Sequence, residues 1–447
     1  MPHLTATPRS TARRLSLVFL FAFAAIPAMG LVAQGSIAQV PHAAAAAVAT
    51  VTAPAPAAAP VEPQHVSLDS TLNEEIVMVP VHGQQVAWWT GKSNKSSGAD
   101  VSAATSNVPA EPAKRSRSGE LETTVYMPPG EGPFPILVLN HGKSLGNPRS
   151  QERARFLTVS REFVKRGYAV VIPMRTGFSK SSGEYVEEYC DMTANGQIQA
   201  NDLDDVLAYV ARQPWADMQR ILVGGQSYGG LTAVAFATHN FPGVKGVINF
   251  AGGLKTNGCQ WESSLVQAFA TYGAQARVPS LWFYGENDSH FGPALASRMH
   301  QAYTAAGGNA TLVKFGAFKN DAHGMSGSRD GIKIWLPETE KFLRQIGMPS
   351  EEIFKLAEPA RLPKSGYAEV NNIAAVPYLR EDGREQYRAF LTKSSPRAFA
   401  LSSSGAWSWV EDGDDPADRA IANCQKNSVS PCKLYAVDGD VVWSDKV

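Results

Sequence analysis

Short, uninterrupted apolar runs alternate with longer helical stretches from Glu74 onward, and this alternation constrains the fold more than any other feature of the chain. Two runs, at 75–81 and 121–127, predict half-buried strands. Continuous apolar runs predict further strands at 134–139, 169–173, 221–223, 247–250, 280–284 and 311–315. Strands buried on both faces are typical of a parallel sheet covered by helices. We therefore predict an α/β fold, with its chemistry at the carboxyl ends of the strands.

Helical patterns connect or follow these strands at 150–166, 201–212, 293–306 and 338–346. Pro337 suits the first turn of the last helix, and Gly347 and Pro349 end it. The α/β domain is therefore predicted to cover residues 67–348.

Residues 349–447 have a different pattern and predict a small α+β domain. Its expected elements are helices near 383–392 and 415–427, a strand near 398–402, and a hairpin at 433–443 around Asp438 and Gly439. Its three tryptophans could form a ligand surface, but core packing is the favoured use of Trp407, Trp409 and Trp443.

The N-terminus combines a basic segment, a short apolar segment and small residues, namely Arg9, Arg13 and Arg14, the run 15–26, and positions 28–30 and 36–38. These are the parts of a secretory leader, so residues 1–38 are predicted to be a signal peptide cleaved between Gly30 and Ala38. An uncleaved anchor is the alternative, but Pro27 and Gly30 interrupt the apolar run. We expect a periplasmic or secreted protein without stable membrane insertion after cleavage.

Two segments lack the large apolar residues that a folded core needs. Residues 39–66 are rich in Ala and Pro and predict a linker, and residues 90–118 predict a disordered loop inside the α/β domain. Lys+Arg and Asp+Glu both number 41, so no net field favours nucleic acid as a partner. A small-molecule or peptide-like substrate is expected instead.

The chain has four cysteines, which tend to pair in an oxidising compartment. Three connectivities are possible. We favour Cys424 with Cys432, which are close in sequence, and Cys190 with Cys259, whose segments flank the site described next. No CxxC pair or cluster of histidines accompanies them, so no metal site is predicted.

The stretch GGQSYGG at 224–230 contains the pattern GxSxG around Ser227. An apolar strand precedes it and a small-residue helix, 229–238, follows it. A tight turn between a buried strand and a helix lifts the serine hydroxyl above the sheet. Ser227 is therefore the predicted nucleophile.

A serine hydroxyl needs a base to take its proton and a carboxylate to orient that base. Asp288 follows the strand at 280–284 and is the predicted acid, with Glu286 as the alternative. His323 follows the last strand and is the predicted base, while Asp321 could cap its turn. His290 and His300 are rival bases, but His300 occupies a helix surface and His290 lies too near Asp288 in sequence.

The developing oxyanion requires backbone donors. One is expected from the N–H of Tyr228, and the other from the N–H of Lys143 in the loop after the strand at 134–139. Gly142 permits close approach, and the ring of His141 is expected to brace this loop.

The motifs NHGKS, VIPMRTGFSKSSG, VGGQSYGG, INFAGG, LWFYGENDSHF and DAHG occur in this order. Together they resemble exported bacterial proteins of the dienelactone hydrolase and prolyl-oligopeptidase-like branch of the α/β-hydrolases, over residues 120–345. The resemblance implies Ser227, Asp288 and His323 as the triad. The chain departs from dienelactone hydrolases in having serine where they carry cysteine, and it lacks the β-propeller of prolyl oligopeptidases.

The residues expected to line the substrate site are His141, Arg175, Tyr284, Phe291 and Trp261. An acidic cluster beside Cys190, formed by Glu184, Glu187, Glu188 and Asp191, could recognise a substrate amino terminus, although a solvated helix face is favoured. The predicted function is an exported serine hydrolase that cleaves carboxylic esters through an acyl-enzyme, without metal or organic cofactor. A serine exopeptidase on the same triad and a non-catalytic binding protein are the alternatives.

Overall fold

The computed structural model describes residues 71–84 and 116–444, apart from residues 359, 394 and 412. The predicted leader (1–38), the linker (39–66) and the loop 90–118 up to residue 115 lie outside the described residues. Residues 116–118, which fall within the predicted loop, belong to a strand instead. No helix in the described part of the chain is long and apolar enough to span a membrane.

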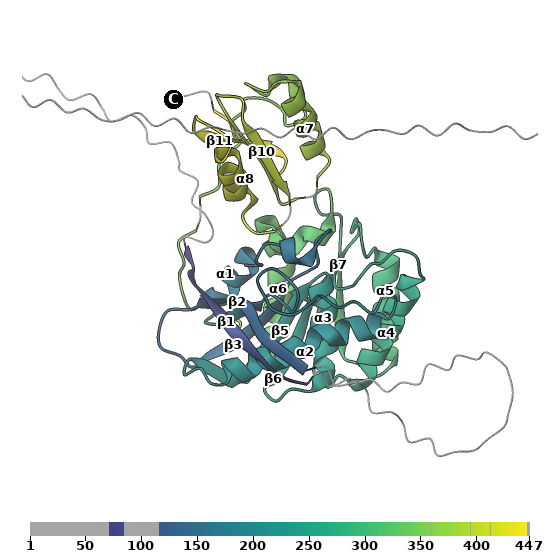
Figure 1. The fold of residues 1–447 in the computed structure, drawn as a ribbon. Helices are drawn as coiled ribbons and strands as arrows, with labels where there is room; N and C mark the ends of the chain where they lie inside the picture. Colours follow the sequence, from purple (N-terminus) through teal and green to yellow (C-terminus); the bar gives the residue numbers. More distant parts are fainter. Residues whose placement is uncertain (1–70, 85–115, 359, 394, 412, 445–447) are drawn as a thin grey trace, which may run out of the picture. The chain divides into compact units, whose positions relative to one another are not determined.

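The larger of the two sheets has eight strands in the order β1-β2-β4-β3-β5-β6-β7-β8, and Figure 1 labels most of them. β2 runs antiparallel to both of its neighbours, and the strands from β4 through β3 to β8 are parallel. This arrangement confirms the predicted fold class. The strands are β1 (Asn73–Gln84), β2 (Ser116–Met127), β3 (Phe134–Asn140), β4 (Ala169–Pro173), β5 (Ala216–Gln226), β6 (Val244–Phe250), β7 (Ser280–Gly285) and β8 (Ala310–Phe315).

Helices cover both faces of this sheet. Successive strand residues point to opposite sides, so each strand contributes to two apolar clusters, one on each face. Ile136 and Val138 of β3 join one apolar cluster, and Leu137 and Leu139 join the other. The first cluster packs against α2 (Met192–Val210), α3 (Tyr228–Phe236), α4 (Trp261–Gln275) and α5 (Pro293–Ala305). The second packs against α1 (Leu157–Lys165) and α6 (Ile332–Gln345).

The start of α6 corrects one sequence prediction. Pro337 lies inside the helix, which begins at Ile332, and not in its first turn. Proline removes one backbone donor from a helix. Here the turn before it is held by burial, since Trp335 is fully buried in the second cluster and Ile332 packs against that cluster.

The small C-terminal domain has a four-stranded sheet in the order β10-β9-β11-β12. Its helices α7 (Glu381–Leu391) and α8 (Pro416–Gln425) pack against opposite faces, because Phe399 and Leu401 of β9 join one cluster and Ala398 and Ala400 join the other. The strands are β9 (Arg397–Ser402), β10 (Trp407–Glu411), β11 (Cys432–Val437) and β12 (Asp440–Val441).

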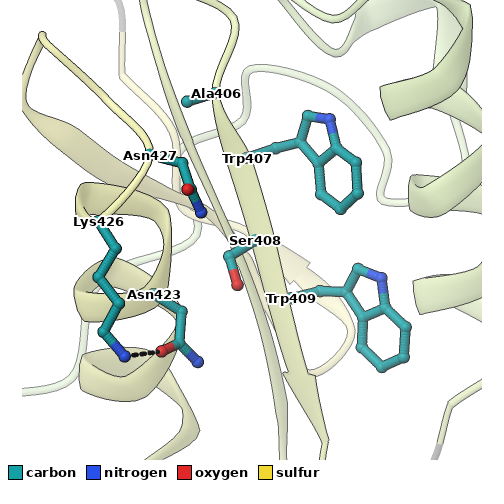
Figure 2. Close-up of a pocket in the computed structure, with 7 residues that line it drawn as sticks. All are labelled: Ala406, Trp407, Ser408, Trp409, Asn423, Lys426 and Asn427. Carbon is teal, nitrogen blue, oxygen red and sulfur yellow. Dashed lines mark hydrogen bonds between the residues drawn. The ribbon is translucent and has the colours of Figure 1, made fainter. Parts of the chain in front are cut away.

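The tryptophans of β10 are partly buried and pack against the apolar cluster on the α7 side of this small sheet. Trp407 stacks on Phe399, with ring centroids 6.4 Å apart, and Trp409 Nε1 donates to Gln386 Oε1 at 3.3 Å. Figure 2 shows both rings on one side of β10, while Ser408 faces the other side, toward α8. A shallow pocket lies along β10 and the end of α8, lined by Ala406, Trp407, Ser408, Trp409, Asn423, Lys426 and Asn427.

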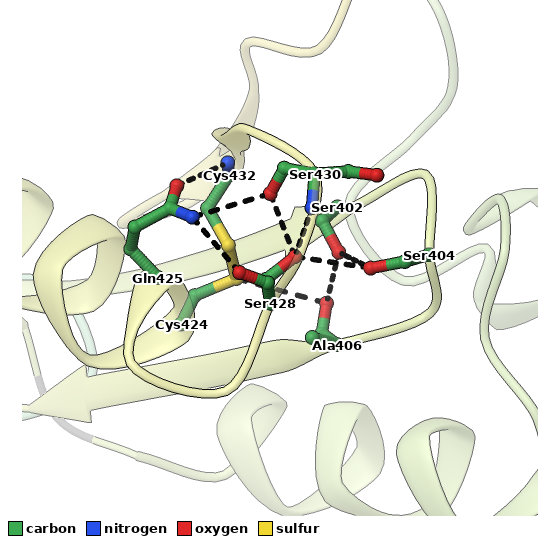
Figure 3. Close-up of a disulfide and its surroundings, with 8 residues drawn as sticks. All are labelled: Ser402, Ser404, Ala406, Cys424, Gln425, Ser428, Ser430 and Cys432. Atoms are coloured by element: carbon green, nitrogen blue, oxygen red, sulfur yellow. Dashed lines mark hydrogen bonds between the residues drawn. A yellow bond between two sulfur atoms is a disulfide. The ribbon is translucent and has the colours of Figure 1, made fainter. Parts of the chain in front are cut away.

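A disulfide joins Cys424 at the end of α8 to Cys432 at the start of β11 (Figure 3). Gln425 reinforces the same turn, since its Oε1 accepts a hydrogen bond from the backbone N–H of Cys432 at 3.0 Å. The second disulfide joins Cys190 to Cys259. These are the two pairings that the sequence favours.

Two aspartates of the C-terminal domain bind the α/β domain. Asp414 accepts the backbone N–H groups of Arg155, Phe156 and Leu157, each at 2.7 Å, and so caps the start of α1. Asp438 accepts from Lys319 Nζ at 2.5 Å. α1 has no capping side chain of its own at the preceding position, so Asp414 satisfies donors that would otherwise lack an acceptor.

Candidate active site

Ser227 lies at the sharp turn between β5 and α3, with φ 56° and ψ −124°. Few non-glycine residues adopt such a conformation, and it is the geometry expected of a nucleophile elbow. The flanking glycines have no room for a side chain. A Cβ at Gly225 would lie 2.2 Å from the Gly229 carbonyl oxygen, and one at Gly229 would lie 1.9 Å from that of Asn140.

Asp288 and His323 meet at the carboxyl ends of β7 and β8. His323 Nδ1 lies 3.2 Å from Asp288 Oδ2, while Asp288 Oδ1 accepts the backbone N–H groups of His290 and Phe291 at 2.8 and 2.9 Å. Burial alone would raise the pKa of the Asp288 carboxyl, but the His323 ring and the two backbone donors lower it below its ordinary value. Asp288 is thus held as a carboxylate beside the imidazole.

The residues considered as alternatives to Asp288 and His323 make other contacts or are exposed. Glu286 is exposed, and His300 directs Nε2 to the carbonyl of Ala310 at 2.9 Å. His290 is exposed and stacks on His323, with ring centroids 4.3 Å apart. Asp321 accepts the backbone N–H of His323 at 2.9 Å and caps the 3-10 turn Ala322–Gly327.

The elbow touches the histidine turn through Gln226, whose Nε2 donates to the carbonyl of His323 at 3.2 Å. Within the described residues the Ser227 hydroxyl makes no hydrogen bond. Catalytic hydrogen bonds are often long without substrate and tighten in the complex.

The loop after β3 lies against the nucleophile. A Cβ at Gly142 would come within 3.2 Å of Ser227 Cβ, so only glycine leaves this approach unhindered. The expected oxyanion donors are the backbone N–H groups of Lys143 and Tyr228. Neither donates to another backbone carbonyl in the described part of the chain, which leaves both available to an anion.

His141 supports this loop from inside the protein. Its Nε2 accepts the backbone N–H of Arg175 at 3.1 Å, so Nδ1 carries the proton and donates to the Gly142 carbonyl at 2.6 Å. Burial and the nearby Arg175 charge hold the pKa of His141 well below its ordinary value. The ring is therefore neutral, and its two hydrogen bonds fix the backbone that precedes Lys143.

Most of the residues expected to line the substrate site are buried. His141, Arg175, Tyr284 and Phe291 are each no more than 1% exposed, whereas Trp261 is half-buried. Arg175 donates from Nε to Gln199 Oε1 at 2.9 Å, and burial lowers its pKa to about 10. Phe291 packs against both Trp261 and His323, so it borders the site through the histidine ring.

One glutamate of the acidic cluster reaches the oxyanion loop. Glu187 Oε2 lies 3.2 Å from Lys143 Nζ and accepts the hydroxyl of Tyr185 at 2.5 Å. Glu184 and Glu188 are exposed, and Asp191 caps α2 by accepting the N–H of Ala194 at 2.9 Å. The disulfide from Cys190 to Cys259 ties this segment to the loop before α4.

Sequence reasoning missed α4, β10 and the contact of Gln226 with His323. It considered His290 only as a rival base and gave no indication that its ring stacks on His323. The one available signal was that Ser289 and His290 directly follow the predicted acid, Asp288, in the same loop.

Comparison with known proteins gives one family match. The family described as X-Pro dipeptidyl-peptidase (S15 family) matches residues 119–311. An Arabidopsis thaliana protein named "Probable glutamyl endopeptidase, chloroplastic" is 25% identical over 263 residues, which are 52% of this chain and 26% of that protein. The cocaine esterase of Rhodococcus sp. (strain MB1 Bresler) is 30% identical over 129 residues, 28% of this chain and 20% of that protein.

The chain therefore spans less than a third of the length of either relative. Among solved structures, an esterase of Pyrococcus furiosus is 14% identical with a TM-score of 0.41, covering 64% of this chain and 99% of that one. The strand order, the serine at the elbow and the matched family agree with the superfamily that the motifs resemble. The chain therefore belongs to the α/β-hydrolase superfamily and is similar to its X-Pro dipeptidyl-peptidase (S15) family over residues 119–311.

Proposed function

We propose that the protein is an exported hydrolase of carboxylic esters, with Ser227 as nucleophile, His323 as base and Asp288 as the acid that orients it. The observation that carries this proposal is the strained Ser227 at the elbow, together with a buried Asp288 that accepts from His323 Nδ1 on the turn that Gln226 contacts. A carboxylate at Nδ1 leaves the lone pair of Nε2 available to take a proton.

In the proposed reaction Ser227 Oγ attacks the acyl carbonyl while His323 Nε2 takes its proton. The backbone N–H groups of Tyr228 and Lys143 stabilise the oxyanion, and His323 returns the proton to the leaving alcohol. Water then hydrolyses the acyl-enzyme by the same proton transfers in reverse. Trp261 and Phe291 are the proposed apolar boundary of the acyl site.

Ser227→Ala tests the nucleophile. We expect hydrolysis of short nitrophenyl esters to fall by about 10⁴-fold or more, with the melting temperature little changed. Ser297→Ala is the matched control, since Ser297 lies on α5, where its hydroxyl donates to the carbonyl of Pro293 at 2.8 Å. An alanine variant with the wild-type rate would refute the proposal.

A serine exopeptidase is the second candidate. The matched family is described as an X-Pro dipeptidyl-peptidase, and Glu187 lies beside the oxyanion loop. Glu187 already interacts with Lys143 and Tyr185, which favours the ester hydrolase because a free carboxylate would be needed to hold a substrate ammonium group. Kinetics on matched esters and aminoacyl amides, with Glu187→Gln and Glu188→Gln, separate the two candidates.

A non-catalytic binding role is the remaining alternative. A fluorophosphonate probe reacts with activated serines, so we expect it to label folded wild-type protein and not Ser227→Ala. Complete absence of labelling would favour the binding role.

Export is proposed from the leader pattern and is supported by two disulfides in the described part of the chain. N-terminal sequencing of protein recovered outside the cytoplasm should give a mature end between Gly30 and Ala38. A chain that retains its leader there would point to the uncleaved anchor.

A further inference from the structure

Three residues at the proposed catalytic centre can act together as metal ligands. Asp288, His290 and His323 each offer one ligand atom, and these atoms lie within 4.8 Å of one another. Two imidazoles and a carboxylate form a donor set that suits zinc. The cluster is reached from solvent through His290, which is exposed.

The distance between the closest pair already matches a metal site. Zinc bonds nitrogen and oxygen at about 2.0–2.2 Å, so two ligand atoms of a tetrahedral site lie about 3.4 Å apart. His323 Nδ1 and Asp288 Oδ2 lie 3.2 Å apart. The ring of His290 stacks on that of His323, with centroids 4.3 Å apart and an interplanar angle of 21°, and its ligand atom lies within 4.8 Å of those of Asp288 and His323.

A hydrogen-bond chain sets the tautomer of His290. The Ser289 hydroxyl donates to Asp321 Oδ2 at 2.6 Å, so its only proton is used there. His290 Nδ1, 2.8 Å from the same oxygen, must therefore be the donor to it. This leaves the lone pair on Nε2, the atom that would bind a metal.

The hydrogen bonds from His290 through Ser289 to Asp321 resemble those that support histidine ligands in known metal sites. Such ligands commonly donate their second ring N–H to a carboxylate or another acceptor, which fixes the ring and raises its basicity. Here Asp321 supports His290 through Ser289, and it also holds the backbone of His323 at 2.9 Å.

We propose that Asp288, His290 and His323 bind a zinc ion that reversibly inhibits the enzyme. The metal takes the place of the proton between His323 Nδ1 and Asp288, and that proton moves to Nε2 of the same ring. No proton is released in this step. His323 then has no lone pair for Ser227, so hydrolysis stops until the metal leaves. The inhibition rests on the proposed function, whereas the binding does not.

Calorimetric titration of zinc chloride into the full chain, with any purification tag removed, tests the binding. We expect wild type and Ser227→Ala to bind one ion equally, and His290→Gln to bind at least about tenfold more weakly. His300→Gln is the matched control and should bind as wild type. Ser289→Ala removes the support of Nδ1 and should also weaken binding, with unchanged melting temperature as the test of folding.

Inhibition is measured as the zinc concentration that halves ester hydrolysis, for each variant against its own zinc-free rate. We expect this concentration to rise at least about tenfold in His290→Gln and to stay unchanged in His300→Gln, with full recovery on adding a chelator. Equal zinc affinity of wild type and His290→Gln, or no binding by wild type, would overturn the proposal. Binding without any ester hydrolysis would instead refute the proposed function and leave the metal site standing.

Discussion

The two oxygens of Asp288 have separate partners. Oδ1 is held by two backbone N–H groups, and Oδ2 faces His323 Nδ1. Replacing the carboxylate by an amide keeps the shape but removes the charge that holds the histidine tautomer.

We therefore expect Asp288→Asn to lower kcat by about 10³- to 10⁴-fold. The measurement is steady-state ester hydrolysis, with thermal melting to check the fold. Glu286→Gln, in the same loop but exposed, is the control and should keep nearly the wild-type rate. The reverse pattern would identify Glu286 as the acid.

The neutral ring of His141 makes stability depend on pH. Its pKa in the folded protein lies well below the ordinary 6.5, so the unfolded chain binds a proton that the folded chain does not. The contribution of His141 to the free energy of unfolding is then fully present above pH 6.5 and falls as the pH drops below that value, by at most about 1.4 kcal/mol per pH unit.

His141→Asn should reduce this dependence. The free energy of unfolding is measured with urea from about pH 7.5 to about pH 5. We expect it to fall less in the variant than in wild type over this range. His290 contributes in the same direction to both proteins, so the difference isolates His141. If the free energy of unfolding changes equally with pH in both proteins, the His141 ring binds a proton in the folded state, contrary to the prediction.

Among the elements, the two disulfides close loops of very different length. Cys190 and Cys259 are separated by 69 positions, and Cys424 and Cys432 by 8. In the chain-entropy account the longer loop gives about 4 kcal/mol and the shorter about 2.5 kcal/mol of stabilisation.

Replacing Cys190 and Cys259 by serine should therefore destabilise the protein more than replacing Cys424 and Cys432. Urea unfolding of the two double variants gives both values. A larger loss from the short loop would mean that packing around Cys424, and not chain entropy, dominates.

The strands and the loops that follow them could be predicted because apolar runs and glycine turns are local signals. The same local signals allowed Ser227, Asp288 and His323 to be assigned to the ends of strands. The start of α6 could not be predicted, since burial of Trp335 outweighs the proline signal. Nor could the burial of Arg175 or the stacking of His290 on His323, because both depend on contacts between distant segments.

At the scale of the whole molecule, the C-terminal domain contacts the turn that carries His323. Lys319, next to this turn, binds Asp438, and a Cβ at Gly324 would lie 2.6 Å from the carbonyl oxygen of Ser395. Asn320 Nδ2 donates to the carbonyl of Lys393 at 3.3 Å. We infer that this domain positions the proposed base.

Asp438→Asn tests this inference, because it removes the charge that attracts Lys319 but keeps an oxygen for the backbone N–H of Arg397. We expect kcat to fall by about tenfold with little change in KM. Asp440→Asn, in the same hairpin and paired with Lys364, is the control. Equal rates in both variants would show that the domain does not affect the histidine turn.

The cap on α1 can form only late in synthesis of the protein, because it comes from a residue far along the chain. Asp414 lies 257 positions beyond Leu157, whose N–H it accepts. A ribosome completes the α/β domain well before it adds this carboxylate, so a nascent or C-terminally clipped chain has an uncapped α1 and an unsupported His323 turn. Full activity would then be the last property that the growing chain acquires, after most of its sheet is in place.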